Sequence, residues 1–289
     1  MIDGHTRTCG LIGNPVEHTM SPAIHNTLAE RLGHNLVYVP FHVEEENVMD
    51  AVKGALGLNI LGLNVTVPYK SDVIPALSEI DDLAEKIGAV NTLVRTEEGY
   101  KGYNTDMPGL YRAMTSEGIR LEEEEVILLG AGGAARAVAF MCAANKVAKV
   151  YLLNRSMEKA QAVAQEVNEK SGRECVYPML LTDYKKLPDK KYLAIQATSV
   201  GLYPETEKAV MESDDFYQKI HTGYDLIYKP SSTKFMQLVQ KQGGRAYHGL
   251  KMLLYQGVIA YELWNNVTVS EEDALMVYKV LKEKMGITE

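Results

Sequence analysis

The chain has 289 residues, 46% of them hydrophobic, and a formal net charge of −8 at neutral pH. This length is enough to bury a sizeable core and suits one large or two ordinary domains. The negative charge argues against general binding to nucleic acid or anionic membranes, so an anionic ligand would need locally placed cations, hydroxyls and backbone amides.

No apolar run approaches the roughly 20 residues that span a bilayer, and the first residues do not have the pattern of a signal peptide. The three cysteines are far apart and form no C-x-x-C pair, which indicates neither a disulfide framework nor a zinc site. They are Cys9, Cys142 and Cys175. We therefore expect a globular cytoplasmic protein with buried thiols, no metal, and no membrane or nucleic-acid partner.

Residues 8–12 predict the first strand, and a helix should follow from Ser21 to about Leu32. Ser21 is expected to be its N-cap, with Pro22 in the first helical position. The preceding loop places the hydroxyls of Thr19 and Ser21 beside the free amides of the helix N-terminus. That arrangement suits a carboxylate, although capping alone would also explain it.

The next segments predict a strand, a helix and a strand in turn, over residues 35–43, 44–57 and 60–67. Alternation of this kind is typical of a parallel sheet in an α/β fold. Asn64, Thr66 and Lys70 lie at or just beyond the end of the last strand, where open α/β sheets bind ligands. An ordinary surface lysine is the alternative for Lys70.

Residues 81–87 predict a short helix, and residues 88–106 a hairpin that carries Asn91 and ends at Asp106. Asp106 stands where a strand meets the next helix. Its carboxylate can cap that helix, or it can hold a neighbouring lysine.

Residues 126–129 are apolar without alternation, which suits a strand buried on both faces. A glycine turn in the pattern G-x-G-x-x-A follows, formed by Gly130, Ala131, Gly132, Gly133, Ala134 and Ala135. Gly130 permits the tight turn, and Gly132 lets a phosphate approach the backbone. The amides at the start of the next helix point at that phosphate, so the turn indicates a Rossmann-type dinucleotide site.

A second strand, over residues 149–153, ends at Asn154 and Arg155. A Rossmann fold reads the adenosine ribose at this point, and an acidic residue there favours NAD. The neutral Asn154 and the guanidinium of Arg155 suit a 2′-phosphate instead, which indicates NADP as the cofactor. A solvated arginine is the alternative.

The remaining segments predict helices over residues 157–170, 250–265 and 271–285, and strands over residues 191–198 and 223–228. Ser156 and Ser270 are the expected N-caps of the first and last of these helices. The paired glycines at 243 and 244 are the best candidate for a domain boundary.

Seven stretches, taken in order, resemble the shikimate dehydrogenase family of NADP-dependent enzymes. They are residues 13–26, 64–70, 88–92, 102–106, 130–133, 154–155 and 225–228. The resemblance covers essentially the whole chain and implies an α/β protein of two domains. A substrate domain with a mostly parallel sheet would consist of residues 1–106 and 245–289, and a Rossmann-type NADP-binding domain, residues 107–244, would be inserted in it.

The resemblance also implies roles for individual residues in the reduction of 3-dehydroshikimate to shikimate. Lys70 and Asp106 would form the catalytic pair, and the hydroxyls of Thr19 and Ser21 would hold the substrate carboxylate. The ring hydroxyls would be contacted by Asn64, Thr66, Asn91, Asp106 and Gln256. The cofactor would be bound by Gly130, Ala131, Gly132, Gly133, Ala134, Asn154, Arg155, Thr198, Tyr228 and Gly249.

Two positions depart from the usual pattern of the family. Thr19 stands where a serine is usual, and its extra methyl can alter the carboxylate pocket or signal use of quinate. Gln196 stands where an asparagine is usual, in a loop expected beside the cofactor. One alternative is therefore a quinate/shikimate dehydrogenase with broader substrate or NAD use. The others are an NADP dehydrogenase for another small acid and a nucleotide-binding sensor without catalysis. A homodimer is compatible with the sequence.

Overall fold

The computed structural model of the chain describes residues 2–287. It divides into two compact units, one made of Met1–Leu110 with Leu253–Glu289 and the other of Tyr111–Met252. The chain passes from one unit to the other inside two helices, α4 (Asp106–Ser116) and α9 (Leu250–Asn265). We expected these passages after residues 106 and 244, so both lie a short way further along the chain.

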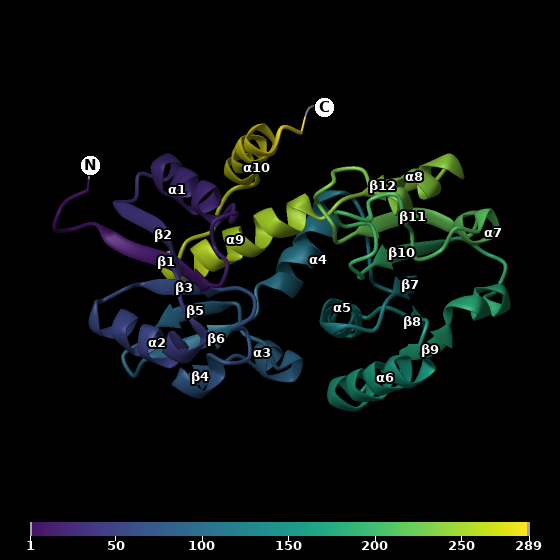
Figure 1. Ribbon diagram of the computed structural model, residues 1–289, viewed down its shortest axis with the longest axis horizontal. Coiled ribbons are helices and arrows are strands. Elements are labelled where there is room, and N and C mark those ends of the chain that lie inside the picture. Colours follow the sequence, from purple (N-terminus) through teal and green to yellow (C-terminus); the bar gives the residue numbers. More distant parts are fainter. Residues whose placement is uncertain (1, 288–289) are drawn as a thin grey trace. The chain divides into compact units, whose positions relative to one another are not determined.

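The first unit contains a mixed six-stranded sheet in the order β2-β1-β3-β5-β6-β4 (Figure 1). Its strands are β1 (Arg7–Gly13), β2 (Leu36–His42), β3 (Gly62–Val65), β4 (Glu79–Ile80), β5 (Thr92–Arg95) and β6 (Tyr100–Tyr103). β1 pairs in parallel with β2 and β3, whereas β5 runs antiparallel to β3 and β6. The predicted parallel strands and hairpin therefore belong to one sheet.

The helical elements of this unit are α1 (Ser21–Arg31), η1 (Glu45–Asn47), α2 (Val48–Gly57), η2 (Ile74–Ala76), α3 (Asp82–Ile87) and α10 (Glu271–Met285), with the parts of α4 and α9 given above. α1 and α10 lie side by side, joined by an ion pair of 2.7 Å between Arg31 and Asp273 (Figure 1). The prediction for the cap of α10 is confirmed, because the Ser270 hydroxyl accepts the Asp273 N–H at 3.1 Å.

The prediction that Ser21 caps α1 is wrong. The N-cap is Met20, which makes no side-chain cap, and Ser21 is already helical. The hydroxyl that folds back on this turn belongs to Thr19, which accepts the Ser21 N–H at 3.2 Å. Thr19 therefore satisfies an amide at the helix start, and the Ser21 hydroxyl is not used for capping.

The second unit contains a parallel six-stranded sheet in the order β12-β11-β10-β7-β8-β9. Its strands are β7 (Glu125–Leu129), β8 (Lys149–Asn154), β9 (Val176–Leu180), β10 (Tyr192–Gln196), β11 (Ile220–Asp225) and β12 (Arg245–Tyr247). The chain order reverses at β7, with β8 on one side and β10 on the other. Open parallel sheets bind ligands at the carboxyl ends of the strands at such a point.

The helical elements of the second unit are α5 (Gly133–Ala144), α6 (Met157–Ser171), η3 (Leu181–Lys186), α7 (Asp214–Tyr217) and α8 (Lys234–Lys241), with the parts of α4 and α9 given above. All four apolar residues of β7, 126–129, are fully buried, which confirms the prediction of a central strand. The structure also confirms the predicted α/β class.

All three cysteines are buried and free, as predicted. Burial raises the pKa of the Cys9 and Cys142 thiols to about 12, so these thiols stay protonated and inert. Within residues 2–287, no group of three or more His, Cys, Asp or Glu side chains is placed to hold a metal ion. None of the helices in this range is long and apolar enough to cross a membrane.

Candidate functional site

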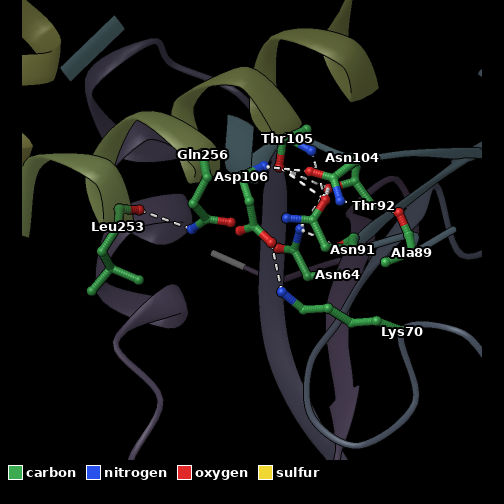
Figure 2. A network of polar contacts seen from close by, with 10 residues as sticks. All are labelled: Asn64, Lys70, Ala89, Asn91, Thr92, Asn104, Thr105, Asp106, Leu253 and Gln256. Carbon is green, nitrogen blue, oxygen red and sulfur yellow. Dashed lines mark hydrogen bonds and ion pairs between the residues drawn. The ribbon is translucent and has the colours of Figure 1, made fainter. Parts of the chain in front are cut away.

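The first unit brings Lys70 and Asp106 together. The Lys70 Nζ lies 2.6 Å from Asp106 Oδ2, and the two side chains are 30% and 21% exposed (Figure 2). The loop after β3 holds the lysine in place, because the buried Tyr69 donates its hydroxyl to the Val43 carbonyl at 2.6 Å and Val90 N–H donates to the Lys70 carbonyl at 2.8 Å. The backbone at Lys70 is therefore fixed, and its ammonium group stays partly exposed beside Asp106.

Asn104 places Asp106 at the start of α4. Its Oδ1 accepts the Asp106 N–H at 3.1 Å, and its Nδ2 donates to the Ala89 carbonyl at 3.0 Å. Asn104 thus accepts the hydrogen bond of the amide at the start of the helix, and the Asp106 carboxylate is free to pair with Lys70. Of the two roles that the sequence allowed for Asp106, the structure has the lysine partner.

The orientation of the Asn91 side chain is fixed by the Thr105 backbone. Asn91 Oδ1 accepts the Thr105 N–H at 2.8 Å and lies 3.1 Å from the hydroxyls of both Thr92 and Thr105. Since a backbone N–H can only donate, the oxygen must face it and the amide nitrogen must point away. That nitrogen has no hydrogen-bond partner within residues 2–287, so it can donate to a ligand.

Asn64 uses its whole hydrogen-bonding capacity inside the protein. Its Oδ1 accepts the Tyr38 hydroxyl at 2.7 Å and lies 3.1 Å from His25 Nε2. Its Nδ2 donates to Thr92 Oγ1 at 3.1 Å and to the Asn91 carbonyl at 3.3 Å. Burial lowers the pKa of His25 to about 3, so its imidazole is neutral and donates from Nε2. Asn64 therefore joins α1, β2 and β3 to the Asn91 segment.

The hydroxyls predicted to bind a carboxylate lie together. Thr19 Oγ1 donates to Ser21 Oγ at 3.2 Å, and Ser21 is buried whereas Thr19 is half-buried. Thr66, which follows β3, is half-buried, and its hydroxyl has no hydrogen-bond partner in the described part of the chain. These groups can donate to an anion without breaking the fold.

Gln256 lies beside Asp106 (Figure 2). Its Nε2 donates to the Leu253 carbonyl at 2.8 Å, which leaves its side-chain oxygen for another partner. A Cβ on Gly109 would lie 2.6 Å from the Gln256 backbone nitrogen. Glycine at 109 is therefore what allows α4 and α9 to approach closely enough to bring Gln256 to this site.

In the second unit, the glycine turn leads from β7 into α5. Gly130 has a φ of +113°, and a Cβ there would lie 2.8 Å from Thr198 Cγ2, so the turn requires glycine. A Cβ on Gly132 or Gly133 would meet nothing within 4 Å. The start of α5 is therefore open above its free amides, as a phosphate site requires.

The end of β8 presents a free cation. The Asn154 Nδ2 donates to the Ser156 carbonyl at 3.0 Å, which fixes the bend into α6. Ser156 caps α6 as predicted, accepting the Lys159 N–H at 3.4 Å. Arg155 between them is exposed and has no ion pair or hydrogen bond with any residue from 2 to 287. Its guanidinium can bind an anionic ligand.

The loops after β10, β11 and β12 carry the other predicted cofactor residues. The Thr198 N–H donates to Gln196 Oε1 at 2.6 Å, so Gln196, the last residue of β10, shapes the loop that follows it. Tyr228 is half-buried, and burial raises its pKa. Gly249 lies where a Cβ would come within 2.1 Å of the Leu226 carbonyl oxygen, so no other residue fits there.

Several residues that shape these sites were not predicted as site residues. Those in the first unit are His25, Tyr38, Thr92, Asn104 and Thr105, and the one in the second is Asp225. His25, Thr92, Asn104, Thr105 and Asp225 stand in stretches that carry the family resemblance, and this was the only sequence signal for them. The residue type alone does not show, for any of the six, which neighbour it bonds.

The first unit has a lysine–carboxylate pair among amides and hydroxyls, and the second is a Rossmann-type unit with an open glycine turn. Together they define a nicotinamide-dependent dehydrogenase of two domains. Three family models match the chain: the shikimate dehydrogenase substrate binding domain at residues 11–93, shikimate/quinate 5-dehydrogenase at residues 113–216, and the shikimate 5′-dehydrogenase C-terminal domain at residues 249–276. The chain belongs to the shikimate dehydrogenase family.

Individual relatives agree with this assignment. The NADP(+) shikimate dehydrogenase of Desulforamulus reducens is 41% identical over 269 residues, which are 92% of each chain. That of Caldanaerobacter subterraneus is 38% identical over 284 residues and covers 98% of this chain and 99% of its own.

Solved structures are similar over nearly the whole chain. Shikimate 5-dehydrogenase from Listeria monocytogenes, in complex with shikimate and NAD, has a TM-score of 0.89 at 30% identity and covers 97% of this chain and 98% of its own. Quinate dehydrogenase from Corynebacterium glutamicum, in complex with NAD, has a TM-score of 0.85 at 26% identity, with coverage of 96% and 99%.

Proposed function

We propose that the chain catalyses the reversible, NADP-dependent reduction of 3-dehydroshikimate to shikimate, a step toward chorismate and the aromatic amino acids. The observation that carries this proposal is the Lys70–Asp106 pair at 2.6 Å, which lies among groups able to bind a hydroxylated ring. The curated relatives with this activity in their names support it.

NADPH, when bound, supplies a hydride to the carbonyl carbon of the substrate. The carbonyl oxygen must then gain a proton, and Lys70 is the group that gives it. Asp106 holds the lysine in position at 2.6 Å and accepts a hydrogen bond from the neighbouring substrate hydroxyl. Because Lys70 is partly exposed, its amine can take up a proton again from solvent.

The remaining groups of the first unit would hold the substrate. Thr19 and Ser21 donate to its carboxylate, and Thr66, Asn91 and Gln256 contact its ring hydroxyls. Asn64 would reach a hydroxyl only by exchanging one of its present bonds, of which the 3.3 Å contact with the Asn91 carbonyl is the longest. We therefore assign Asn64 both a structural and a binding role.

The second unit would bind NADP along the carboxyl ends of β7, β8, β10 and β11. The glycine turn, from Gly130 through Ala131, Gly132 and Gly133 to Ala134, would hold the pyrophosphate. Asn154 and Arg155 would hold the ribose with its 2′-phosphate. Thr198, Tyr228 and Gly249 would lie beside the nicotinamide half. What supports this is that the strands before them, β10, β11 and β12, are on the other side of β7 from β8.

Quinate oxidation is the second candidate activity. The methyl group of Thr19 changes the carboxylate pocket, and a quinate dehydrogenase that binds NAD is among the similar structures. We further propose that the protein works in the cytoplasm on a small-molecule substrate without a nucleic-acid partner. A homodimer remains compatible with these assignments.

The test is the formation of reduced nicotinamide when purified protein is offered shikimate or quinate, each with NADP and with NAD. Turnover of shikimate with NADP supports the proposal. Comparable turnover of quinate or with NAD would assign the chain to the broader enzymes of the family. No turnover with any pair would contradict the proposal and favour a nucleotide-binding sensor.

A further inference from the structure

Asp225, the last residue of β11, is a fully buried carboxyl group without a cationic partner within residues 2–287. Its Oδ1 accepts the Ile227 N–H at 3.0 Å and lies 3.4 Å from Gln196 Nε2. Its Oδ2 accepts the Thr233 hydroxyl at 2.6 Å. Burying a carboxyl group costs free energy unless hydrogen bonds satisfy it. The segments that supply these hydrogen bonds therefore indicate what Asp225 does in the fold.

Gln196 extends this arrangement into the loop after β10. Its Oε1 accepts the Thr198 N–H at 2.6 Å, and its Nε2 also donates to the Val200 carbonyl at 3.0 Å. The Gln196 carbonyl accepts the Leu226 N–H at 3.1 Å. One buried amide therefore connects the loop after β10 to the loop after β11.

The loop after β11 is in turn joined to Gly249. The Ile227 carbonyl accepts the Gly249 N–H at 3.0 Å. In the loop after β10, Thr198 packs against Gly130. Asp225 is thus no more than two hydrogen-bonded steps from segments that carry three of the proposed cofactor residues. These residues are Thr198, Tyr228 and Gly249.

The two carboxylate oxygens of Asp225 serve different structures. Oδ1 faces the two loops through Ile227 and Gln196, whereas Oδ2 faces Thr233, whose hydroxyl also accepts the Met236 N–H at the start of α8. Substitutions of Gln196 and of Thr233 can therefore test separately how Asp225 holds the two loops and how it holds the start of α8.

We propose that Asp225 and Gln196 are positioning residues that set the loops around the nicotinamide half of the cofactor site. Neither is proposed to touch the reacting atoms. The proposal rests on the proposed function only through the assignment of NADP to this unit. It predicts that disturbing the pair weakens binding of the nicotinamide half and leaves the adenosine half, which Asn154 and Arg155 would bind, unchanged.

The experiment compares Asp225→Ala, Asp225→Asn, Gln196→Met and Thr233→Val by calorimetric titration with two probes, NADPH and adenosine 2′,5′-bisphosphate. Asp225→Ala and Gln196→Met should raise the dissociation constant of NADPH about tenfold, the usual effect of losing one or two hydrogen bonds. Both should bind the bisphosphate, which has no nicotinamide, as the unaltered protein does. Asp225→Asn keeps an oxygen toward Ile227 and should stay within about threefold for NADPH, less than the effect of one hydrogen bond.

Thr233→Val is the matched control for stability. It removes the bond to Oδ2 and the cap of α8, so the melting temperature should fall by about 2–4 °C while both dissociation constants stay unchanged. If Asp225→Ala does not fold, the NADPH affinity of Gln196→Met alone tests the proposal, because methionine keeps the shape of glutamine without its hydrogen bonds.

Unchanged NADPH affinity in Gln196→Met would overturn the proposal. Equal weakening of both probes would also overturn it, since that result indicates general loosening of the unit. An unaltered protein without turnover of shikimate or quinate would contradict the proposed function, but the two dissociation constants would still decide the role of Asp225 and Gln196.

Discussion

The Lys70 ammonium and the Asp106 carboxylate lie 2.6 Å apart although the two residues are 36 positions apart in the chain. Each is held by its own backbone anchors: Lys70 by the loop that the buried Tyr69 fixes, and Asp106 by the Asn104 side chain. The contact therefore does not depend on the two flexible side chains alone. A pair prepared in this way suits proton transfer at a fixed point.

Replacing Lys70 with alanine removes the proposed proton donor. Turnover of shikimate should fall by about 10²- to 10⁴-fold, the usual effect of losing a general acid, while the affinity for NADPH stays unchanged. The control is Lys101→Ala, because Lys101 has the same exposed fraction of 30% and also pairs with a carboxylate, that of Glu79 at 3.1 Å. Near-normal turnover in Lys70→Ala would refute the assignment.

Asn91→Asp tests the amide that faces away from Thr105. Aspartate keeps the oxygen that accepts the Thr105 N–H, but it replaces the free NH₂ donor with an acceptor. The KM for shikimate should rise about tenfold or more, as when a site loses one hydrogen bond to its substrate, and the KM for NADP should not change.

Thr105→Val is the control for that substitution. It removes one hydroxyl donor to Asn91 and retains the backbone N–H that orients the amide. The KM for shikimate should therefore stay within about threefold, since two of the three donors remain. If the valine variant has the larger effect, the orientation of Asn91 is not set by the Thr105 backbone.

The sequence was most informative where local chemistry decides structure. The apolar run at 126–129, the glycine turn after it and the serine caps at Ser156 and Ser270 were predicted correctly, because each depends on a few neighbouring residues. The cap of α1 was wrong for a related reason. Two hydroxyls stand next to each other there, and only the structure shows that Thr19 rather than Ser21 accepts the first amide.

The orientation of side chains in the site could not be predicted. That Asn64 is saturated by Tyr38, His25, Thr92 and the Asn91 segment depends on contacts between residues up to 39 positions apart. The short strands β4, β9 and β12 were missed as well. All three are edge strands that pair with a single neighbour, and their own sequences carry only a weak strand pattern.

Arg155→Asp tests the choice between NADP and NAD. The exposed guanidinium would lose its charge-assisted bonds to the 2′-phosphate, and an aspartate would accept bonds from the free 2′-hydroxyl of NAD. We expect kcat/KM with NADP to fall about 100-fold or more, the loss of two charge-assisted bonds, and that with NAD to change little. An unchanged ratio between the two cofactors would contradict the role of Arg155.

Arg245→Asp is the control for this change of charge. Arg245 is also exposed and lies at the first residue of β12, on the opposite edge of the sheet from β8 and β9 and at the opposite end of the parallel strands from Arg155. The substitution alters the net charge of the same unit equally. The preference between the cofactors should therefore stay as in the unaltered protein.

Asp225→Asn tests how the Asp225 carboxyl changes the free energy of unfolding with pH. Burial raises the pKa of the Asp225 carboxyl from 3.8 to about 6. The folded protein therefore binds a proton that the unfolded chain has lost between these two values, so the Asp225 contribution to stability falls as pH rises from about 4 to 6. Above pH 6 the ionised carboxylate costs up to about 3 kcal/mol, a cost that asparagine does not have.

The measurement is urea unfolding of the unaltered protein and of Asp225→Asn at pH 7.5 and pH 4.5. The free energy of unfolding of the unaltered protein should increase relative to the variant by about 2 kcal/mol on going to the lower pH. Other titrating groups are common to both proteins and cancel in this difference. A difference that is constant between the two pH values would mean that Asp225 does not titrate above its ordinary range, and one of opposite sign would mean that its hydrogen bonds outweigh its burial.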